Sequence, residues 1–398
     1  MKSLPVGRLF CYDCSMKKIL ISVSLLLLLT QQASAQEITD EIPPDEFYRA
    51  EIIEIVEEQE TDTGDDVITT QVLKVKFLSG DLKDQEKEIL NDGLFNVNGG
   101  NKLEVGDKIL VFKTSAEGIE NFYIADIYRV PSLIVIVVAF FLLAVVLSRW
   151  KGLMSILGLI ISILVIVQYV VPQILDGKNP LVISLTGALV IALVSIYLAH
   201  GFNRRTTIAL ISTLLTLSLA AGLSILFVST GKLFGLGSEE AFYIQQLGSL
   251  EDLNLRGLLL GGIILGVLGV LDDITTAQSA AVYEIRRANP ALPFKELYSR
   301  GLSIGREHIS SLVNTLFLAY AGASLPLFLF FTAGDHPQPF WVTLNSEFIA
   351  EELIRTLVGS VALMLAVPIT TFLAAYYFSR RPVEQSAAGE HSHHGHFH

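Results

Sequence analysis

The chain has 398 residues, of which 51% are hydrophobic and only 17% are charged. Soluble globular proteins carry about 25% charged residues, so this composition predicts a polytopic membrane protein. The formal net charge of −12 argues against a nucleic-acid-binding protein, since such proteins are typically basic.

The first 35 residues resemble a secretory signal. Met16–Lys18 supplies the basic start, 19–30 an apolar run, and Ala33–Ala35 a small-residue cleavage site. We therefore predict a signal peptide over 1–35, with Met16 as its true start. The alternative is an uncleaved anchor, although the apolar run is short for a membrane span.

The two cysteines of the chain, Cys11 and Cys14, both precede this cleavage site. They form a C-x-x-C pair with no βαβ pattern around it and no second ligand pair, so we expect neither a zinc site nor a redox site. The mature chain would then contain no cysteine.

Residues 36–130 are polar and acidic, with short runs in which apolar residues alternate. Gly and Asn-Asp-Gly turn signals separate the runs, which is typical of β-strands. We predict a small extracytoplasmic β-domain, either an OB-like barrel or a sandwich. The alternating runs are 48–57, 69–77, 108–112 and 121–128.

Residues 131–380 are dominated by long apolar stretches, and we predict an α-helical transmembrane domain there. Each stretch is near the ~20 residues that a helix needs to cross a bilayer. We predict seven transmembrane helices, at about 131–149, 152–172, 180–200, 206–230, 256–283, 309–332 and 353–378.

The charges of the connecting loops predict the orientation. Basic residues such as Arg204, Arg205 and Arg300 fall on one side, and acidic residues such as Glu239 and Glu347 fall on the other. By the positive-inside rule the basic side is cytoplasmic. A cleaved signal and an odd number of spans agree with this, placing the β-domain outside and the C-terminus inside. The residues 381–398 are expected to be a disordered, His-rich cytoplasmic tail, which either binds metal or has no role.

Two adjacent carboxylates, Asp272 and Asp273, interrupt an apolar run where the helix should still lie in the membrane. Ionisable groups at that depth are energetically expensive and are candidates for function. On a helix, Asp272, Thr276 and Ser279 share one face, while Asp273 and Glu284 share another. Such oxygens suit a site for a cation or a proton. The alternative is that Asp273 caps a new helix that starts at the next residue.

Two further features of the same region are candidates. Asn314 in the next span lies at a similar depth and could donate a hydrogen bond to the aspartates, or it could simply join helices. Small residues permit close helix packing, and a flexible gate is the alternative. The glycines concerned are Gly261, Gly262, Gly266 and Gly269.

Motifs of several enzyme classes are missing from the sequence. It has no G-x-x-x-x-G-K-[ST] loop for ATP, no H-E-x-x-H and no G-x-S-x-G. We therefore expect no catalytic residues, no enzyme activity and no cofactor, and no ligand set for a particular metal emerges.

The region 255–375 resembles the YibE/F family of multi-spanning bacterial membrane proteins. The resemblance implies a signal, an extracytoplasmic β-domain and a permease-like region in the cytoplasmic membrane, without a settled substrate. Only one branch of the family shares the Asp-Asp pair, and the position of Asp273 is the more general one. The motifs are Gly266–Thr275, Gln278–Ala280, Glu284, Arg287–Pro290, Leu302–His308, Val313–Leu316, Ala319–Pro326 and Val367–Thr370.

The sequence thus predicts a transporter or permease that moves an ion or a small solute through the bilayer. The alternative is a non-transporting scaffold or assembly factor whose β-domain binds a partner. In either case the partners are lipid and either a second copy or another protein, and not nucleic acid.

Overall fold

The computed structural model describes residues 46–62, 67–91, 102–116, 119–246, 253–332 and 339–381. The predicted signal peptide with its cysteine pair, and the His-rich tail beyond residue 381, lie outside these ranges. The chain forms two compact units that divide between Val146 and Leu147, and each unit is described by itself.

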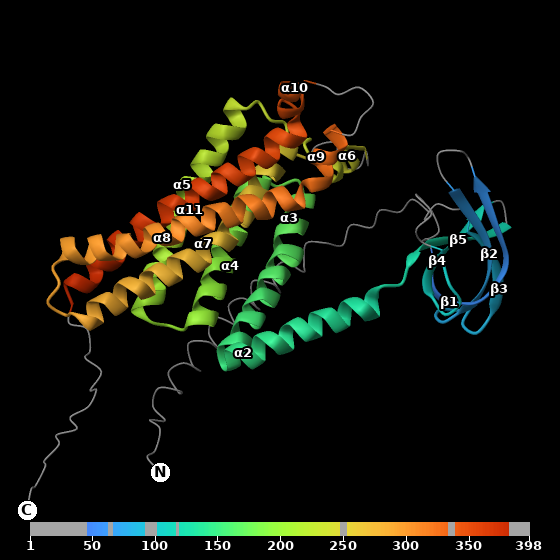
Figure 1. Ribbon diagram of the computed structural model, residues 1–398, viewed down its shortest axis with the longest axis horizontal. Helices are drawn as coiled ribbons and strands as arrows, with labels where there is room; N and C mark the ends of the chain where they lie inside the picture. Colours follow the sequence, from blue (N-terminus) through green and yellow to red (C-terminus); the bar gives the residue numbers. More distant parts are fainter. Residues whose placement is uncertain are drawn as a thin grey trace, which may run out of the picture. The chain divides into compact units, whose positions relative to one another are not determined.

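The first unit contains one five-stranded sheet in which all neighbouring strands are antiparallel (Figure 1). The strand order β3-β2-β1-β4-β5 leaves β3 and β5 at the edges. The strands are β1 (Glu46–Asp62), β2 (Val67–Phe77), β3 (Glu86–Asn91), β4 (Lys108–Ala116) and β5 (Ile119–Ile127).

Alternation of apolar residues gives this sheet one buried face. Ala50 of β1 pairs with Phe77 on one side and with Ile109 on the other, and all three side chains are fully buried. Register shifts in the β1–β2 pairing, after Ile52 and after Ile55, mark bulges, which increase the local twist and bend the strand. The sheet therefore curves around its own core.

The two edge strands approach each other through side chains. Lys87 of β3 lies 3.6 Å from a carboxylate oxygen of Glu120 and 3.9 Å from the ring centre of Phe122, both on β5. No backbone ladder joins the two edges in the part of the sheet that is described. The domain is thus a half-barrel made from one sheet, which agrees with the barrel alternative and not with a two-sheet sandwich.

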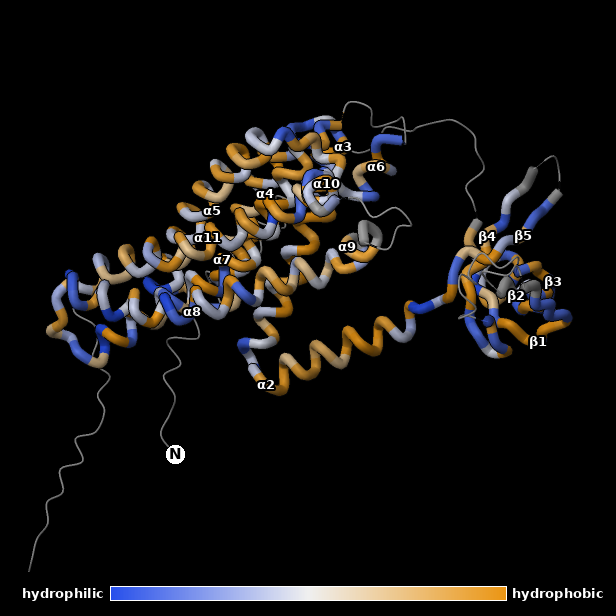
Figure 2. The backbone as a smooth tube through the Cα atoms, turned by 45° about the horizontal axis from the view of Figure 1, so that its top comes forward, coloured by the Kyte–Doolittle hydropathy of each residue, from blue (hydrophilic) through white to orange (hydrophobic). Residues whose placement is uncertain are grey.

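The remaining elements are helical. Five of the helical segments are long and apolar enough to cross a membrane, as judged over the described residues. Figure 2 shows that their residues are predominantly hydrophobic. The helical elements are α2 (Val130–Val165), η1 (Ile166–Val170, a π-helical turn), α3 (Val171–Leu175), α4 (Pro180–His200), α5 (Arg204–Thr230), α6 (Glu239–Gln246), α7 (Leu255–Ala288), α8 (Phe294–Ala323), α9 (Leu325–Thr332), α10 (Phe340–Leu344) and α11 (Glu347–Ser379).

Two differences explain why five segments replace the seven expected. The spans predicted at 131–149 and 152–172 join into one segment of 46 residues, in which Arg149 alone leaves the helical conformation, with φ 53° and ψ −131°. The span predicted at 309–332 is divided at Ser324 between α8 and α9. The first half of α8 is charged and α9 has only eight residues, so neither helix qualifies by itself.

Helix α7 is the centre of the bundle, because it packs against α4, α5, α8 and α11. It runs parallel to α4, as Gly261 lies against Ser184 and Asp272 against Ser195. A side chain at Gly261 would collide with the Ser184 hydroxyl, so the missing Cβ permits this close approach.

Candidate functional site

Asp272 is the residue around which the candidate site is built. Its side chain is half-buried in the bundle, and its Oδ2 accepts a hydrogen bond from the Ser195 hydroxyl of α4. The other carboxylate oxygen, Oδ1, is buried without any hydrogen-bond partner in the described structure. Since an unpaired buried acceptor costs ~1–3 kcal/mol, this oxygen is suited to take a ligand or a proton.

The alternative in which Asp273 caps a new helix is wrong. Helix α7 runs without a break from Leu255 to Ala288, so no helix begins after Asp273. The backbone amides that a cap would satisfy already belong to the continuous helix. The aspartates therefore lie in the middle of a helix and not at a broken one.

The face predicted for Asp272, Thr276 and Ser279 does point into the bundle. Thr276 donates its hydroxyl to the Asp272 carbonyl at 2.8 Å, and Ser279 donates to the Arg205 carbonyl of α5 at 2.9 Å. Between them, the hydroxyls of Thr275 and Thr213 are 2.7 Å apart and link α7 to α5. A narrow polar seam therefore follows α7 between α4 and α5.

Asp273 and Glu284 lie on the other face, as predicted, and both are exposed in the described chain. Glu284 lies 3.7 Å from Arg205 and 3.3 Å from Arg287, so it belongs to an ion-pair group at the basic end of α7. Asp273 makes no side-chain hydrogen bond or ion pair to a described residue. The two carboxylates are thus not brought into one site with Asp272.

Asn314 is exposed on α8 and makes no side-chain hydrogen bond to any residue that the structure describes. The hydrogen-bond partner of Asp272 is instead Ser195 of α4, which lies 77 residues earlier in the chain. The structure therefore does not bring Asn314 together with the aspartates.

The four glycines of α7 divide by face. Gly261 faces α4, and a Cβ at Gly266 would lie 3.2 Å from the Tyr320 hydroxyl of α8. At Gly262 and Gly269 nothing lies within 4 Å of such a Cβ. Close packing thus accounts for Gly261 and Gly266, whereas the other two border open space.

A buried amide connects α7 to two more helices. Gln278 donates to the Gly301 carbonyl of α8 at 2.8 Å and to the Thr371 hydroxyl of α11 at 2.7 Å. A Cβ at Gly305 would lie 3.0 Å from the Gln278 Oε1, so glycine leaves room for the amide. This contact anchors α8 near its beginning.

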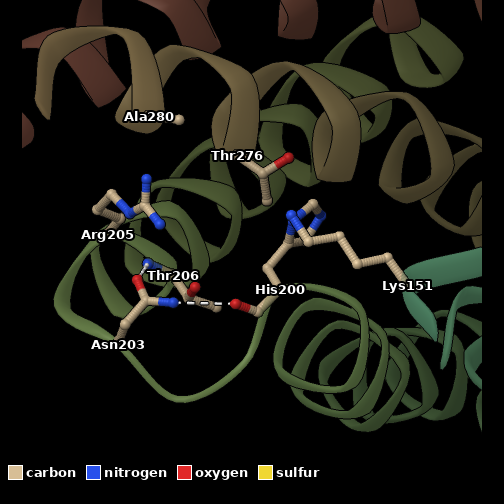
Figure 3. Close-up of a pocket in the computed structure, with 7 residues that line it drawn as sticks. All are labelled: Lys151, His200, Asn203, Arg205, Thr206, Thr276 and Ala280. Atoms are coloured by element: carbon tan, nitrogen blue, oxygen red, sulfur yellow. Dashed lines mark hydrogen bonds between the residues drawn. The ribbon is translucent and has the colours of Figure 1, made fainter. Parts of the chain in front are cut away.

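A pocket of about 200 Å³ opens one helical turn beyond Asp272 (Figure 3). The lining residues belong to α2, α4, α5 and α7 and to the turn before α5, and Figure 3 shows their side chains around the pocket. The lining residues are Lys151, His200, Asn203, Arg205, Thr206, Thr276 and Ala280.

A second pocket, of about 280 Å³, lies at the opposite end of α7 and includes Gly262 and Leu265. Its polar lining includes Glu351 and Arg355 of α11. Glu351 is 4% exposed and accepts the backbone N–H of Gly237 at 2.9 Å. Arg355 thus contributes a charge to a pocket within the bundle, and a carboxylate oxygen of Glu352 lies 3.9 Å from its Nε.

Sequence reasoning missed several of these residues. Ser195 lies in an ordinary apolar run, so nothing local distinguishes it as the partner of Asp272. Gln278 had been noted only as part of a motif. Asn203 carried a usable signal, because an Asn three residues before a Thr at the start of an apolar run is typical of a helix N-cap. The described residues contain no cluster of three His, Cys, Asp or Glu side chains that could hold a metal ion.

The sequence profile of the family described as YibE/F-like protein matches residues 136–380. The match covers more than half of the chain and includes every helix from α3 to α11. The chain belongs to the YibE/F-like family. No match was found among curated proteins or among solved structures.

The family match begins inside α2, so it covers the helical bundle and not the half-barrel. Membership, together with the five apolar helices, makes this chain a membrane protein of the YibE/F-like family. The candidate site around Asp272 lies inside the matched region.

Proposed function

We propose that this YibE/F-like protein is a permease-type transporter that moves an ion or a small solute through its helix bundle, without enzyme activity. The observation that supports this most is Asp272, a carboxylate in an apolar helix with one oxygen bonded to Ser195 and the other unpaired. A charge at this depth is expensive to keep, and such residues mark ion and proton pathways in membrane proteins.

The two pockets support the same function. Leu265 lines one pocket and Thr276 lines the other, and these residues are about 16 Å apart along α7 at ~1.5 Å per residue. Asp272 lies between them, one turn from Thr276. A carboxylate that lies between two pockets at the centre of the bundle fits a binding site that opens alternately to each side of the membrane.

We also propose seven crossings, with the half-barrel outside, the C-terminus inside, and the bacterial cytoplasmic membrane as the location. The 46-residue segment containing α2 would be about 69 Å long, more than twice the ~30 Å of a hydrocarbon core. The break at Arg149 divides it into two halves that each suffice for one crossing. Helices α8 and α9 together would supply the sixth crossing.

Cysteine labelling tests this topology, because the chain from Gln36 onward has no cysteine of its own. Ser303→Cys lies on the α8 segment that we assign to the cytoplasmic side. We expect it to react with a membrane-impermeant maleimide only after cell permeabilisation. Reaction in intact cells would contradict the orientation.

Flux of candidate ions into proteoliposomes tests transport. Asp272→Asn keeps the size of the side chain and its hydrogen bond with Ser195, but it removes the charge, so we expect it to abolish flux. We expect Asp273→Asn to abolish flux as well, because the family resemblance favours that position. If both variants matched the parent protein at equal reconstitution, the carboxylates would have no part in transport.

The rival proposal is a scaffold whose half-barrel binds a partner outside. One feature favours it: Phe47, Phe112 and Tyr123 form an aromatic row across β1, β4 and β5, in which Phe47 and Tyr123 are exposed and Phe112 is half-buried. The ring centres are 6.2 Å and 5.2 Å apart, and Phe47 is 63% exposed. Absence of flux for every ion tested, with loss of function in Phe47→Ala, would favour the scaffold.

A further inference from the structure

The pocket at the beginning of α5 gathers positive charge without a carboxylate in its lining. Lys151, His200 and Arg205 come from three different helices and converge on a space of about 200 Å³ (Figure 3). One water takes about 30 Å³ of liquid, so this space admits a tetrahedral oxyanion together with a few waters. The pocket therefore has both the charge and the size for an anionic group.

The N-terminus of α5 adds backbone N–H groups, which can donate hydrogen bonds to an anion. Asn203 caps α5, accepting the N–H of Thr206 at 3.0 Å and donating to the His200 carbonyl at 2.9 Å. The N–H groups of Arg204 and Arg205 have no acceptor among the described residues. Since α5 is 27 residues long, its N-terminus also carries the positive end of the helix dipole.

Thr206 provides an independent observation. Its side chain is 3% exposed and lines the pocket, yet its hydroxyl makes no hydrogen bond to any residue that the structure describes. The residue is almost fully buried, but its hydroxyl still reaches the pocket, where a ligand or a water can accept its hydrogen bond. Packing alone does not explain a threonine at this position.

Arg205 is held in place from outside the pocket. Its guanidinium lies 5.0 Å from the ring centre of Tyr283 and 3.7 Å from Glu284. Both members of this ion pair are roughly half-exposed, and such pairs are weak, so Arg205 remains available to an anion. An arginine can contact two oxygens of one phosphate at once.

We propose that this pocket binds a phosphate-class oxyanion with a net negative charge, supplied either as free phosphate or as the phosphate of an anionic lipid headgroup such as that of phosphatidylglycerol. Lys151 and Arg205 provide the charge, and His200, Thr206 and the first amides of α5 provide hydrogen bonds. Asp272 is not part of this pocket. The inference goes beyond the proposed transport, because the pocket can bind an anion whether or not the bundle transports.

Binding to the purified full-length chain tests the proposal. In the first arm, inorganic phosphate is titrated into protein in a neutral detergent, and binding is measured by calorimetry. In the second arm, thermal unfolding is compared in phosphatidylcholine nanodiscs with and without phosphatidylglycerol. Binding in the first arm identifies free phosphate as a ligand, and stabilisation only in the second identifies the headgroup.

The variants are Lys151→Gln and Arg205→Gln, each of which removes one pocket charge. We expect each to weaken binding about tenfold, as typical for the loss of a charge-assisted hydrogen bond. The matched controls are Lys295→Gln and Arg300→Gln, on exposed positions of α8 outside the pocket, and these should bind like the parent. Lys151 is exposed, so its variant tests the site even if Arg205→Gln does not fold.

Two results would overturn the proposal. One is no effect of either phosphate or phosphatidylglycerol on the parent protein. The other is an equal loss of binding in the pocket variants and in the α8 controls, which would reveal only a general effect of surface charge.

Discussion

The half-barrel and the helical bundle treat their polar groups in opposite ways. In the half-barrel, the charged side chains lie on the surface and pair there, as Lys102 does with Glu58 and Glu60 at 2.6 Å each. Among the described residues, the buried polar side-chain atoms without a hydrogen-bond partner all belong to the bundle. They are Asp272 Oδ1, Arg286 Nε, Arg355 Nε and Thr370 Oγ1.

This contrast shows that the two units differ in which interactions stabilise them. The half-barrel is stabilised by its apolar core, and its charges contribute solubility more than stability. The bundle keeps groups whose burial is costly, and such incompletely satisfied groups are typical of sites that bind or move something. The predictions below test whether the two units differ in this way.

The largest effect on stability should come from the core of the half-barrel. Phe77 is completely buried, with its ring against Tyr48 and Phe122. We expect Phe77→Ala to cost ~3–5 kcal/mol, because it removes the ring and leaves a cavity. Hydrogen exchange should accelerate throughout β1, β2 and β4 and remain unchanged in α5 and α7.

The matched control is Phe47→Ala, on the exposed face of the same sheet. We expect its stability to stay within ~0.5 kcal/mol of the parent. Faster exchange in the bundle of Phe77→Ala would break the comparison, since it would show that the two units do not unfold separately.

The second effect concerns packing within the bundle. A Cβ at Gly305 would collide with Val367 and approach the Gln278 amide, so Gly305→Ala should destabilise by ~1–3 kcal/mol. Gly262→Ala is the control, because nothing lies within 4 Å of its Cβ, and the helix itself should gain ~0.5–1 kcal/mol. Thermal unfolding in detergent should therefore move in opposite directions for the two variants.

A smaller effect on stability, with a larger one on flux, is expected for Ser195→Ala. The hydrogen bond to Asp272 disappears, and such bonds between membrane helices contribute ~0.6 kcal/mol on average. Under the proposed function, the carboxylate loses its positioning partner and flux falls. Ser195→Thr keeps a hydroxyl and should restore flux. Equal flux in Ser195→Ala and in the parent would show that transport does not need this hydrogen bond.

The smallest effect should be the response of the half-barrel to acid. The hydrogen bond from Lys102 lowers the pKa of Glu58 below its ordinary value of 4.5, and the Tyr48 hydroxyl lowers the pKa of Asp81. A lowered folded-state pKa stabilises the fold above the unfolded value, and this stabilisation is lost as the pH falls through the folded-state pKa.

We therefore expect exchange in β1 and β2 to accelerate modestly below about pH 4 and to be insensitive to pH above 5. Because these groups are exposed, high salt should weaken the effect. Lys102→Gln removes the strongest cause at Glu58 and should make the acid response smaller. An unchanged response in that variant would mean that other carboxyls determine it.

Local patterns in the sequence predicted much of this fold. The alternating runs around Ile52, Leu73 and Val111 became strands with buried inner residues, because a half-buried sheet imposes a period of two. The helical faces of Asp272 and Asp273 were also predicted, since the spacing of residues on a helix is fixed by its geometry.

What failed depends on contacts between distant residues. The capping alternative assumed that a new helix starts after Asp273, whereas α7 continues past both aspartates and Ser195 of α4 is bonded to Asp272. The link to Ser195 could not be predicted either, because one serine in an apolar run does not indicate which helix it will face. Similarly, nothing near Arg149 showed that a single residue would replace the loop between two spans.

The three-way contact of Gln278 has a consequence for how this family varies. The Gln278 amide donates hydrogen bonds to the Gly301 carbonyl and to the Thr371 hydroxyl, and it occupies the space that the missing side chain of Gly305 leaves. A change at any of these positions leaves the others mismatched, so single substitutions should be rare and paired ones should survive. We expect positions 278, 305 and 371 to be substituted together among related chains. Gly262 and Gly269, whose Cβ positions have no neighbour within 4 Å, should be substituted independently of them.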